Sequence, residues 1–362
     1  MNVQNLIDEG VELFDNKKFD EAIEKLNQAL DRIKTKNTQI QQQNDIQFWL
    51  GRCYLEQAIK AKGEAADKLF EQTIEHRQQQ FELAKRLVDK QKRIQEQINV
   101  QFWFGRCYFT QALEAKGEVA DKLFEQAVDR HQQELKLAKQ LVDVQNSIQQ
   151  QFYAQFWLGR CYREQAVRTK GDATDELFEY AVEHHQQQLE LAKQLVTNNR
   201  IQQQIDAQAW CVRCYFEQAM KTRGDKIASQ PFKRVVKHLQ QQLTLTKKLV
   251  DKQNHIQQQI IVNFGFGRCY FEQAVFIKED KDNSEALLKK AARYFLYVLK
   301  QLKQLDENPQ LFEGISLDGD LHKKIMQRQV YHYLKKIYFF MERWRYYLKW
   351  KKQEIQEKLF EN

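Results

Sequence analysis

Apolar residues recur along this chain with the period of an α-helix, in pairs of stretches that repeat about every 54 residues. In one unit, the first stretch runs from Ile94 to Ala115 and ends at Lys116-Gly117, a typical helix-stop signal. The second runs from Val119 to Val142, and its predicted buried stripe consists of Phe124, Val128, Leu135, Ala138 and Val142. Each unit therefore predicts a hairpin of two helices of roughly 22–25 residues each.

One phrase marks the first helix of every unit. It reads FWLGRCYLEQA at 48–58, FWFGRCYFTQA at 102–112, FWLGRCYREQA at 156–166, AWCVRCYFEQA at 209–219 and FGFGRCYFEQA at 264–274. The glycine lowers helix propensity by about 1 kcal/mol but lets a neighbouring helix approach closely. Phe48 and Trp49 point to adjacent sides of the helix, so at least one of them is expected to pack between hairpins. Because one hairpin cannot cover its own apolar face, the units are expected to stack as an α-solenoid.

The N-terminal part of the chain resembles a standard tetratricopeptide repeat (TPR). Within 4–30, the family's spacing is matched by Leu6, Gly10, Leu13, Ala22, Leu26 and Ala29. The longer units resemble the same motif with extended helices, as in Phe104-Gly105 and Tyr108 of the first helix and Phe124 of the second. The resemblance implies an all-α fold: an α-solenoid of stacked antiparallel helical hairpins (a TPR-like superhelix) with a C-terminal capping helix.

The same patterns predict where the parts of the chain begin and end. An N-terminal hairpin is expected over 1–36 and five long-helix units over 37–306. The unit boundaries are expected near 40–92, 93–146, 147–199, 200–254 and 255–306. A loop and a basic, aromatic helix are expected over 307–362.

An arginine stands between the glycine position and the cysteine in every unit: Arg52, Arg106, Arg160, Arg213 and Arg268. The TPR resemblance implies that this position faces the concave groove, although packing gives no evident reason for a guanidinium there. A row of arginines would suit the carboxylates or phosphates of an acidic peptide, because guanidinium binds them with two parallel hydrogen bonds. Alternatively, the arginines pair within their own helices with Glu56, Glu164, Glu217 and Glu272, four residues further on.

The other recurring polar residues favour structural interpretations. His131 and His185 fall on the apolar stripe of the second helices, and without clustered carboxylates or cysteines they make poor metal ligands. The cysteines of the phrase are about 54 residues apart, which favours small buried thiols over disulfides or metal ligands. The Cys211-x-x-Cys214 pair lacks a second pair. The runs of three glutamines, at 41–43, 78–80, 186–188, 202–204, 240–242 and 257–259, are interpreted as solvated helix faces.

The last helical stretch, 329–360, combines many aromatic residues with many basic ones. As a cap it would cover the last hairpin and keep its basic face in water. The aromatic residues exceed what one buried stripe needs, which suggests a second contact surface for a homo-oligomer, a further domain or a protein partner. The residues proposed for that surface are Tyr338, Arg343, Trp344, Arg345, Tyr347 and Trp350. Nucleic acid and an anionic membrane surface are weaker alternatives.

Composition narrows the class of protein. The 362 residues are 42% hydrophobic and 29% charged, with a net charge of +8 concentrated in the C-terminal stretch, as expected for a folded scaffold with a basic end. No phosphate-binding loop, zinc-protease or nucleophile motif occurs, and no cofactor or metal is predicted. No signal peptide or membrane span is evident, and a cytoplasmic protein is expected. The sequence therefore predicts a non-enzymatic scaffold or adaptor that binds a protein or acidic peptide segment in its groove. Two alternatives stay open: a regulatory or sensor subunit of a larger complex, such as one with a bacterial protease or nucleic acid, and a self-assembling structural protein.

Overall fold

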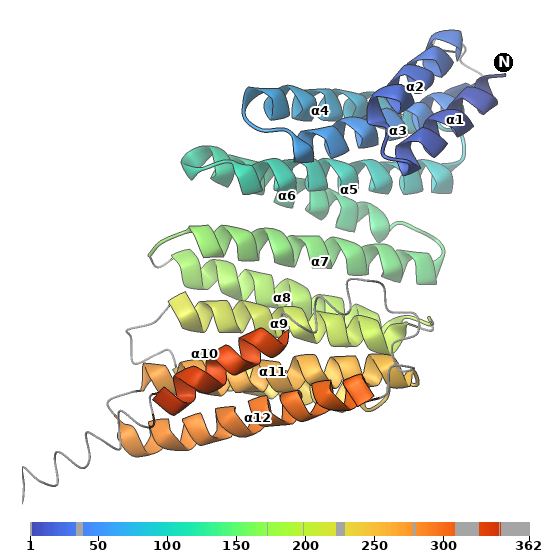
Figure 1. Cartoon of the computed structure of the whole chain (residues 1–362). Coiled ribbons are helices and arrows are strands. Elements are labelled where there is room, and N and C mark those ends of the chain that lie inside the picture. The colour runs from blue at the N-terminus through green and yellow to red at the C-terminus, as the bar shows by residue number, and fades with distance from the viewer. Residues whose placement is uncertain are drawn as a thin grey trace, which may run out of the picture. The chain divides into compact units, whose positions relative to one another are not determined.

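The computed structural model is helical, and consecutive helices pair as antiparallel hairpins (Figure 1). It describes residues 2–33, 39–171, 173–197, 199–221, 229–277, 280–307, 326–339 and 341. Two compact units, Met1–Thr197 and Asn198–Asn362, divide the chain, and each has its own architecture. Among the described residues, no helix has the length and apolar character needed to cross a membrane.

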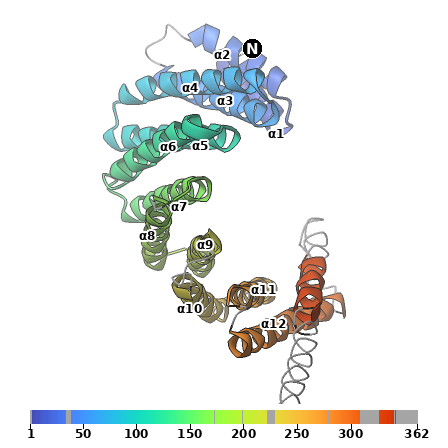
Figure 2. The same ribbon diagram turned by 90° about the vertical axis from the view of Figure 1, so that its left-hand side faces the viewer.

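The first unit, 1–197, consists of four hairpins. Their helices are α1 (Val3–Asp15), α2 (Phe19–Ile33), α3 (Ile40–Lys60), α4 (Glu64–Lys85), α5 (Lys90–Glu114), α6 (Gly117–Ala138), α7 (Val144–Arg168) and α8 (Ala173–Gln194). The second helix of each hairpin packs on the first helix of the next, and first helices also touch, as α5 and α7 do. Figure 2 shows hairpins α3–α4, α5–α6 and α7–α8 following one another through this unit. The predicted solenoid of stacked helical hairpins is confirmed.

Short turns with defined caps separate the helices. Asp89 and Asp143 are the N-cap residues of α5 and α7. Their side chains accept hydrogen bonds from the backbone N–H of Lys92 (2.7 Å) and Asn146 (2.9 Å). Within hairpins, Gly63 (φ 59°) and Gly117 (φ 58°) adopt the left-handed conformation that glycine tolerates best. These caps fix where one helix ends and its neighbour begins.

The end of α6 differs from its prediction. The helix ends at Ala138, and Val142, expected in the buried stripe, is 75% exposed. The chain must leave the helix here so that Asp143 can take the extended conformation of an N-cap. The backbone N–H of Val142 instead donates to Oε1 of Gln91 at the start of α5 (3.0 Å). A hydrogen bond to α5, the first helix of the same hairpin, therefore holds the turn, and burial of the valine side chain does not.

The glycines of the repeated phrase set how closely the two helices of a hairpin approach. An added methyl group at Gly51 would come within 3.0 Å of the Arg77 guanidinium. At Gly105 and Gly159 it would overlap the rings of His131 and His185. The predicted close approach is thus confirmed, and in these three hairpins it occurs against one polar side chain of the second helix, whereas Gly267 of the last hairpin faces Phe295.

The second unit, 198–362, contains two further hairpins and part of the C-terminal stretch. Its helices are α9 (Arg200–Lys221), α10 (Ser229–Thr246), α11 (Lys252–Phe276) and α12 (Lys281–Glu307), followed by a helix over 326–339. Val330, Leu334 and Ile337 are buried in the core around Phe295. Tyr333 stacks on Phe295 with ring centroids 5.1 Å apart. Over its described residues, this helix covers the last hairpin as the predicted cap does.

Candidate functional site

Three of the predicted arginines form a continuous row with tryptophans along the first helices of unit 1–197. The Cζ atom of Arg52 lies 5.2 Å from the ring centroids of both Trp49 and Trp103. Arg106 lies 4.9 Å from Trp103 and 5.5 Å from Trp157. Arg160 lies 4.9 Å from Trp157. We call Arg52, Trp103, Arg106, Trp157 and Arg160 the arginine–tryptophan row.

The row explains why packing uses a guanidinium at this position, which the sequence did not reveal. Each tryptophan reaches from its own first helix to the arginine of the preceding hairpin, so the ring and the cation belong to neighbouring hairpins. Phe48 and Trp103 also meet across hairpins, with centroids 5.9 Å apart, which confirms that the aromatic pair packs between hairpins. Stacking of this kind contributes roughly 0.5–2 kcal/mol per cation–ring pair.

Shared rings fix the spacing of the charges. The distances of 5.2 and 4.9 Å to the Trp103 centroid keep the Cζ atoms of Arg52 and Arg106 within about 10 Å of each other. The Trp157 ring limits the spacing of Arg106 and Arg160 in the same way. All three arginines are half-buried. The row therefore places each positive charge within about 10 Å of the next.

The alternative pairing with a glutamate of the same helix is not what holds Arg52 and Arg106. Among the residues the structure describes there, neither Arg52 nor Arg106 has a carboxylate oxygen within 4.0 Å. The carboxylate of Glu164 pairs with the neighbouring Arg163. Burial lowers the pKa values of Arg52 and Arg106, and the positive charge of Arg52 adds to the effect on Arg106. Glu56 partly offsets both shifts from a longer distance.

The two predicted arginines of unit 198–362 have looser surroundings. The Arg213 guanidinium lies 5.1 Å from the Trp210 ring centroid, and its side chain is 55% exposed. It approaches Glu217 at 3.6 Å, which is the predicted pairing four residues along a helix. Arg268 lies 4.7 Å from the ring centroid of Phe216 in the preceding hairpin. The pairing with glutamate that the sequence raised as an alternative thus occurs at Arg213, and Arg268 stacks on a ring of the preceding hairpin, which the sequence did not predict.

Besides Arg52 and Arg106, a third guanidinium lies near the Trp103 ring. It belongs to Arg77 of α4, and its Cζ atom is 5.3 Å from the ring centroid. Arg77 is fully buried, and its Nη1 donates to Oε1 of Gln80 (2.8 Å). Its Nε and Nη2 atoms are buried without a hydrogen-bond partner, and burial lowers the pKa of Arg77 to about 9. The sequence reasoning missed this residue, although it stands one repeat before His131 and could have been found by aligning the units.

His131 and His185 occupy the position of Arg77 in the next two hairpins and are fully buried, as predicted. The Nδ1 atom of His131 lies 2.7 Å from Oε2 of Glu134, and its ring stacks on Trp157 with centroids 5.7 Å apart. Burial raises the pKa of Glu134. His185 makes the matching contact with Gln188 (3.0 Å). Each buried polar group is thus paired three residues further along its helix.

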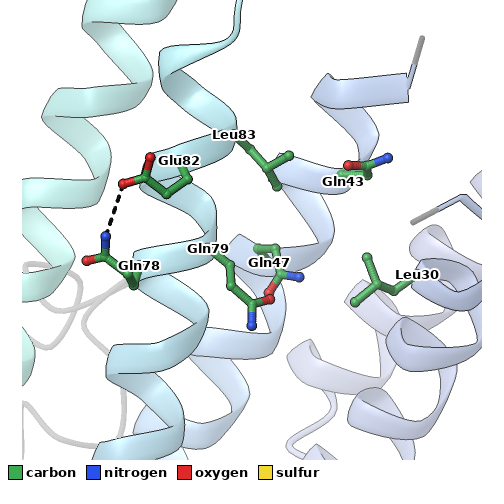
Figure 3. Close-up of a pocket in the computed structure, with 7 residues that line it drawn as sticks. All are labelled: Leu30, Gln43, Gln47, Gln78, Gln79, Glu82 and Leu83. Carbon is green, nitrogen blue, oxygen red and sulfur yellow. Dashed lines mark hydrogen bonds between the residues drawn. The ribbon is translucent and has the colours of Figure 1, made fainter. Parts of the chain in front are cut away.

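Two similar grooves open between the second helices of successive hairpins. The first, of about 440 Å³, is lined by Leu30 of α2, Gln43 and Gln47 of α3, and residues of α4 that include Gln79 and Glu82 (Figure 3). The second, of about 510 Å³, is lined by equivalent residues, among them Gln151, Gln155, Gln187 and Glu190. Neither groove is lined by a residue of the arginine–tryptophan row.

The glutamine runs were predicted to be solvated helix faces, and this is wrong for one residue in most of them. In five of the six runs the last glutamine is buried: Gln43, Gln80, Gln188, Gln204 and Gln242. Three successive helical positions span most of a turn, so one of them faces inward. Gln43, for example, donates to the carbonyl oxygen of Ile33 at 2.7 Å. Gln43 thus links α3 to the end of α2, whereas Gln80 and Gln188 accept or share hydrogen bonds with Arg77 and His185 of their own helices.

The cysteines and the histidine clusters give no sign of a metal site within the described residues. All six cysteines are buried and none forms a disulfide, and burial raises the pKa values of Cys53, Cys107 and Cys211 to about 12. No group of three His, Cys, Asp or Glu side chains that could hold a metal occurs in the described ranges.

The proposed C-terminal surface is described in part. Tyr338 is 59% exposed, beside the exposed Phe339 and on the same helix as the exposed Tyr331. Arg343, Trp344, Arg345, Tyr347 and Trp350 lie outside the described residues.

No protein-family model matches the sequence, and no curated protein matches it. Among solved structures, the apo form of RapI is 14% identical and aligns over 93% of this chain and 100% of that one, with a TM-score of 0.49. A Rap protein complexed with competence and sporulation factor is 12% identical over 92% and 75%, with a TM-score of 0.40. The C-terminal part of a TPR repeat-containing protein from Cytophaga hutchinsonii is 16% identical over 82% and 99%, with a TM-score of 0.29. These likenesses concern the fold alone, and with TM-scores below 0.5 the assignment of the solenoid rests on the hairpins of this chain.

Proposed function

We propose that this protein is a non-enzymatic, cytoplasmic scaffold that binds an acidic segment of a partner protein along the arginine–tryptophan row. The observation that carries the proposal is the geometry of Arg52 and Arg106. Their guanidinium groups are held between rings, half-buried, and have no carboxylate within 4.0 Å among the described residues of unit 1–197. We further infer that the units are long-helix relatives of the tetratricopeptide repeat, because Leu6, Gly10 and Leu26 pack together at the family's spacing.

The rings determine what such arginines can bind. Indole rings lie against the guanidinium groups, so a ligand is expected to approach their N–H edges. A carboxylate fits such an edge with two parallel hydrogen bonds. Because stacking already restricts the side chains, binding would cost less conformational entropy than it would for free surface arginines. The row thus supports recognition of acidic side chains more than recognition of an aromatic or basic ligand.

The spacing within the row suggests a test with a defined probe. An extended peptide advances about 3.3–3.6 Å per residue, so a glutamate at every third position recurs at roughly 10 Å, which matches the upper limit that the Trp103 ring sets on the spacing of Arg52 and Arg106. The probe is a fluorescein-labelled 12-residue peptide that repeats Gly-Ser-Glu, and its control repeats Gly-Ser-Gln. Fluorescence anisotropy measures the binding of both peptides to the full chain.

We expect the glutamate peptide to bind more tightly than the glutamine peptide, and the preference to weaken as salt concentration rises. The triple variant Arg52→Gln, Arg106→Gln, Arg160→Gln should lose at least tenfold in affinity for the glutamate peptide. Circular dichroism shows whether the variant keeps its helices. Equal binding of the two peptides, or unchanged binding by a folded triple variant, would refute the proposed role of the row.

A second candidate function is self-association through the helix at 326–339. Tyr331, Tyr338 and Phe339 are each about 60% exposed on this helix, which favours a contact surface there. Light scattering of the full chain would show a dimer or larger assembly, and the variant Tyr331→Ser, Tyr338→Ser should reduce it. A monomer at high concentration would exclude this candidate.

A further inference from the structure

The fourth residue after each arginine of the repeated phrase is a glutamate in every unit except one. The glutamates are Glu56, Glu164, Glu217 and Glu272, and the exception is Thr110, which follows Arg106. A carboxylate four residues after an arginine lies on the same helix face and can neutralise it, as Glu217 approaches Arg213 at 3.6 Å. The unit that contains Arg106 therefore lacks a negative charge that the others carry.

The threonine does not take over the role of the missing carboxylate. The Oγ1 atom of Thr110 donates to the backbone carbonyl oxygen of Arg106 (2.8 Å), so the hydroxyl is engaged with its own helix. The charged groups that influence Arg106 are Glu56, which favours its positive form from beyond ion-pair distance, and Arg52, which opposes it. Burial opposes the charge more strongly than either of them.

The surroundings of Arg106 also restrict the direction from which a ligand can come. Its Cζ atom lies between the rings of Trp103 (4.9 Å) and Trp157 (5.5 Å), with Phe102 at 6.0 Å. Arg52 contacts the same Trp103 ring at 5.2 Å, and Arg160 contacts the same Trp157 ring at 4.9 Å. Arg106 is thus the arginine that shares a ring with each of the other two arginines of the row, and its guanidinium stays half-buried among these rings.

We propose that Arg106 is the residue of the row that directly binds a carboxylate of the partner, because its own helix carries no glutamate four residues further on. This inference rests on the proposed function and makes it specific: one acidic side chain of the partner substitutes for the glutamate absent at position 110. The neighbouring Arg52 and Arg160 position and supplement this contact.

The substitution Thr110→Glu tests the inference because it restores the residue found in the other four units. Glutamate is tolerated at those positions, so the variant is expected to fold, and circular dichroism and thermal unfolding check this. An internal carboxylate would pair with Arg106 and repel the acidic probe. Affinity for the Gly-Ser-Glu peptide should fall tenfold or more. The matched variant Thr110→Gln, which has the same size without the charge, should stay within about twofold of the parent chain.

A double-mutant cycle shows whether the effect passes through Arg106. The variant Arg106→Gln alone should weaken binding as much as Thr110→Glu does, and the two changes together should cost little more than either one. Equal affinities of the Thr110→Glu and Thr110→Gln variants would overturn the inference while leaving the proposed function in place. If instead the parent chain does not distinguish the glutamate peptide from the glutamine peptide, the proposed function itself fails.

Discussion

At the scale of single residues, the position that faces the glycine of the repeated phrase in unit 1–197 is polar and fully buried: Arg77, His131 and His185. Each is paired with a side chain three residues further on, and Arg77 and His131 also lie against the tryptophan of the next hairpin. These side chains are flat and polarisable, which suits the space between a glycine and an indole. The buried polar residues therefore help to define how one hairpin sits on the next.

Burial of histidine makes stability depend on pH. Burial lowers the pKa of His185 to about 3, and those of His76 and His238 to about 4. Below pH 6.5 the unfolded chain binds protons that the folded chain does not, so stability is expected to fall as the pH falls from 6.5 toward 4.

The substitution His185→Leu tests this, because Leu239 stands at the equivalent position of the next hairpin, three residues before a buried glutamine. Urea unfolding at pH 6.5 and pH 5 should show that the parent chain loses about 1.5 kcal/mol more than the variant over this interval. An identical loss in both proteins would mean that His185 is protonated in the folded state.

The sequence predicted the burial of some residues but not the surroundings of others. The burial of His131 and His185 followed from helical spacing alone, because spacing determines which side of a helix a residue occupies. The surroundings of Arg106 did not follow, because Trp103 and Trp157 meet it through the packing of successive hairpins. The burial of Arg77 was missed because a charged residue is rarely buried without a carboxylate.

At the scale of elements, the hairpins are long helices whose ends are set by caps more than by hydrophobic pattern. The pattern of α6 continues to Val142, but the helix ends at Ala138. Valines at the equivalent turns, Val88, Val196 and Val250, are also 80% or more exposed. The apolar pattern thus identifies the helices, and the aspartate that follows Val88 and Val142 identifies where the next one begins.

The cap at Asp143 should contribute measurably to stability. Replacing Asp143 with Ala removes the side-chain acceptor of the Asn146 N–H, and the free energy of unfolding should fall by about 1 kcal/mol. Asp143→Asn keeps an acceptor oxygen and should cost much less. Chemical denaturation of the two variants measures the difference. A Val142→Ser change in the same turn should stay within about 0.5 kcal/mol, because the side chain is exposed.

At the scale of the whole molecule, helices in each unit pack mainly on their neighbours in sequence. In unit 1–197, α4 packs on α5 and α6 packs on α7, and in unit 198–362, α10 packs on α11. In such a linear array, stability is approximately the sum of the terms for each repeat and for each contact between neighbours. A local defect is therefore expected to weaken its own hairpin and the adjacent one more than distant hairpins.

The helix at 326–339 allows this to be tested at one end of the array. Leu334 is 6% exposed in the core around Phe295, so Leu334→Asp would place an unpaired charge against α11 and α12. Hydrogen exchange should then show lost protection in 326–339, α11 and α12, with protection of α3 to α8 unchanged. Tyr338→Asp, one turn further along at a 59% exposed position, should leave every helix protected. If Leu334→Asp lowered protection equally from α1 to α12, the chain would unfold as one cooperative body, and stability could not be a sum over neighbouring hairpins.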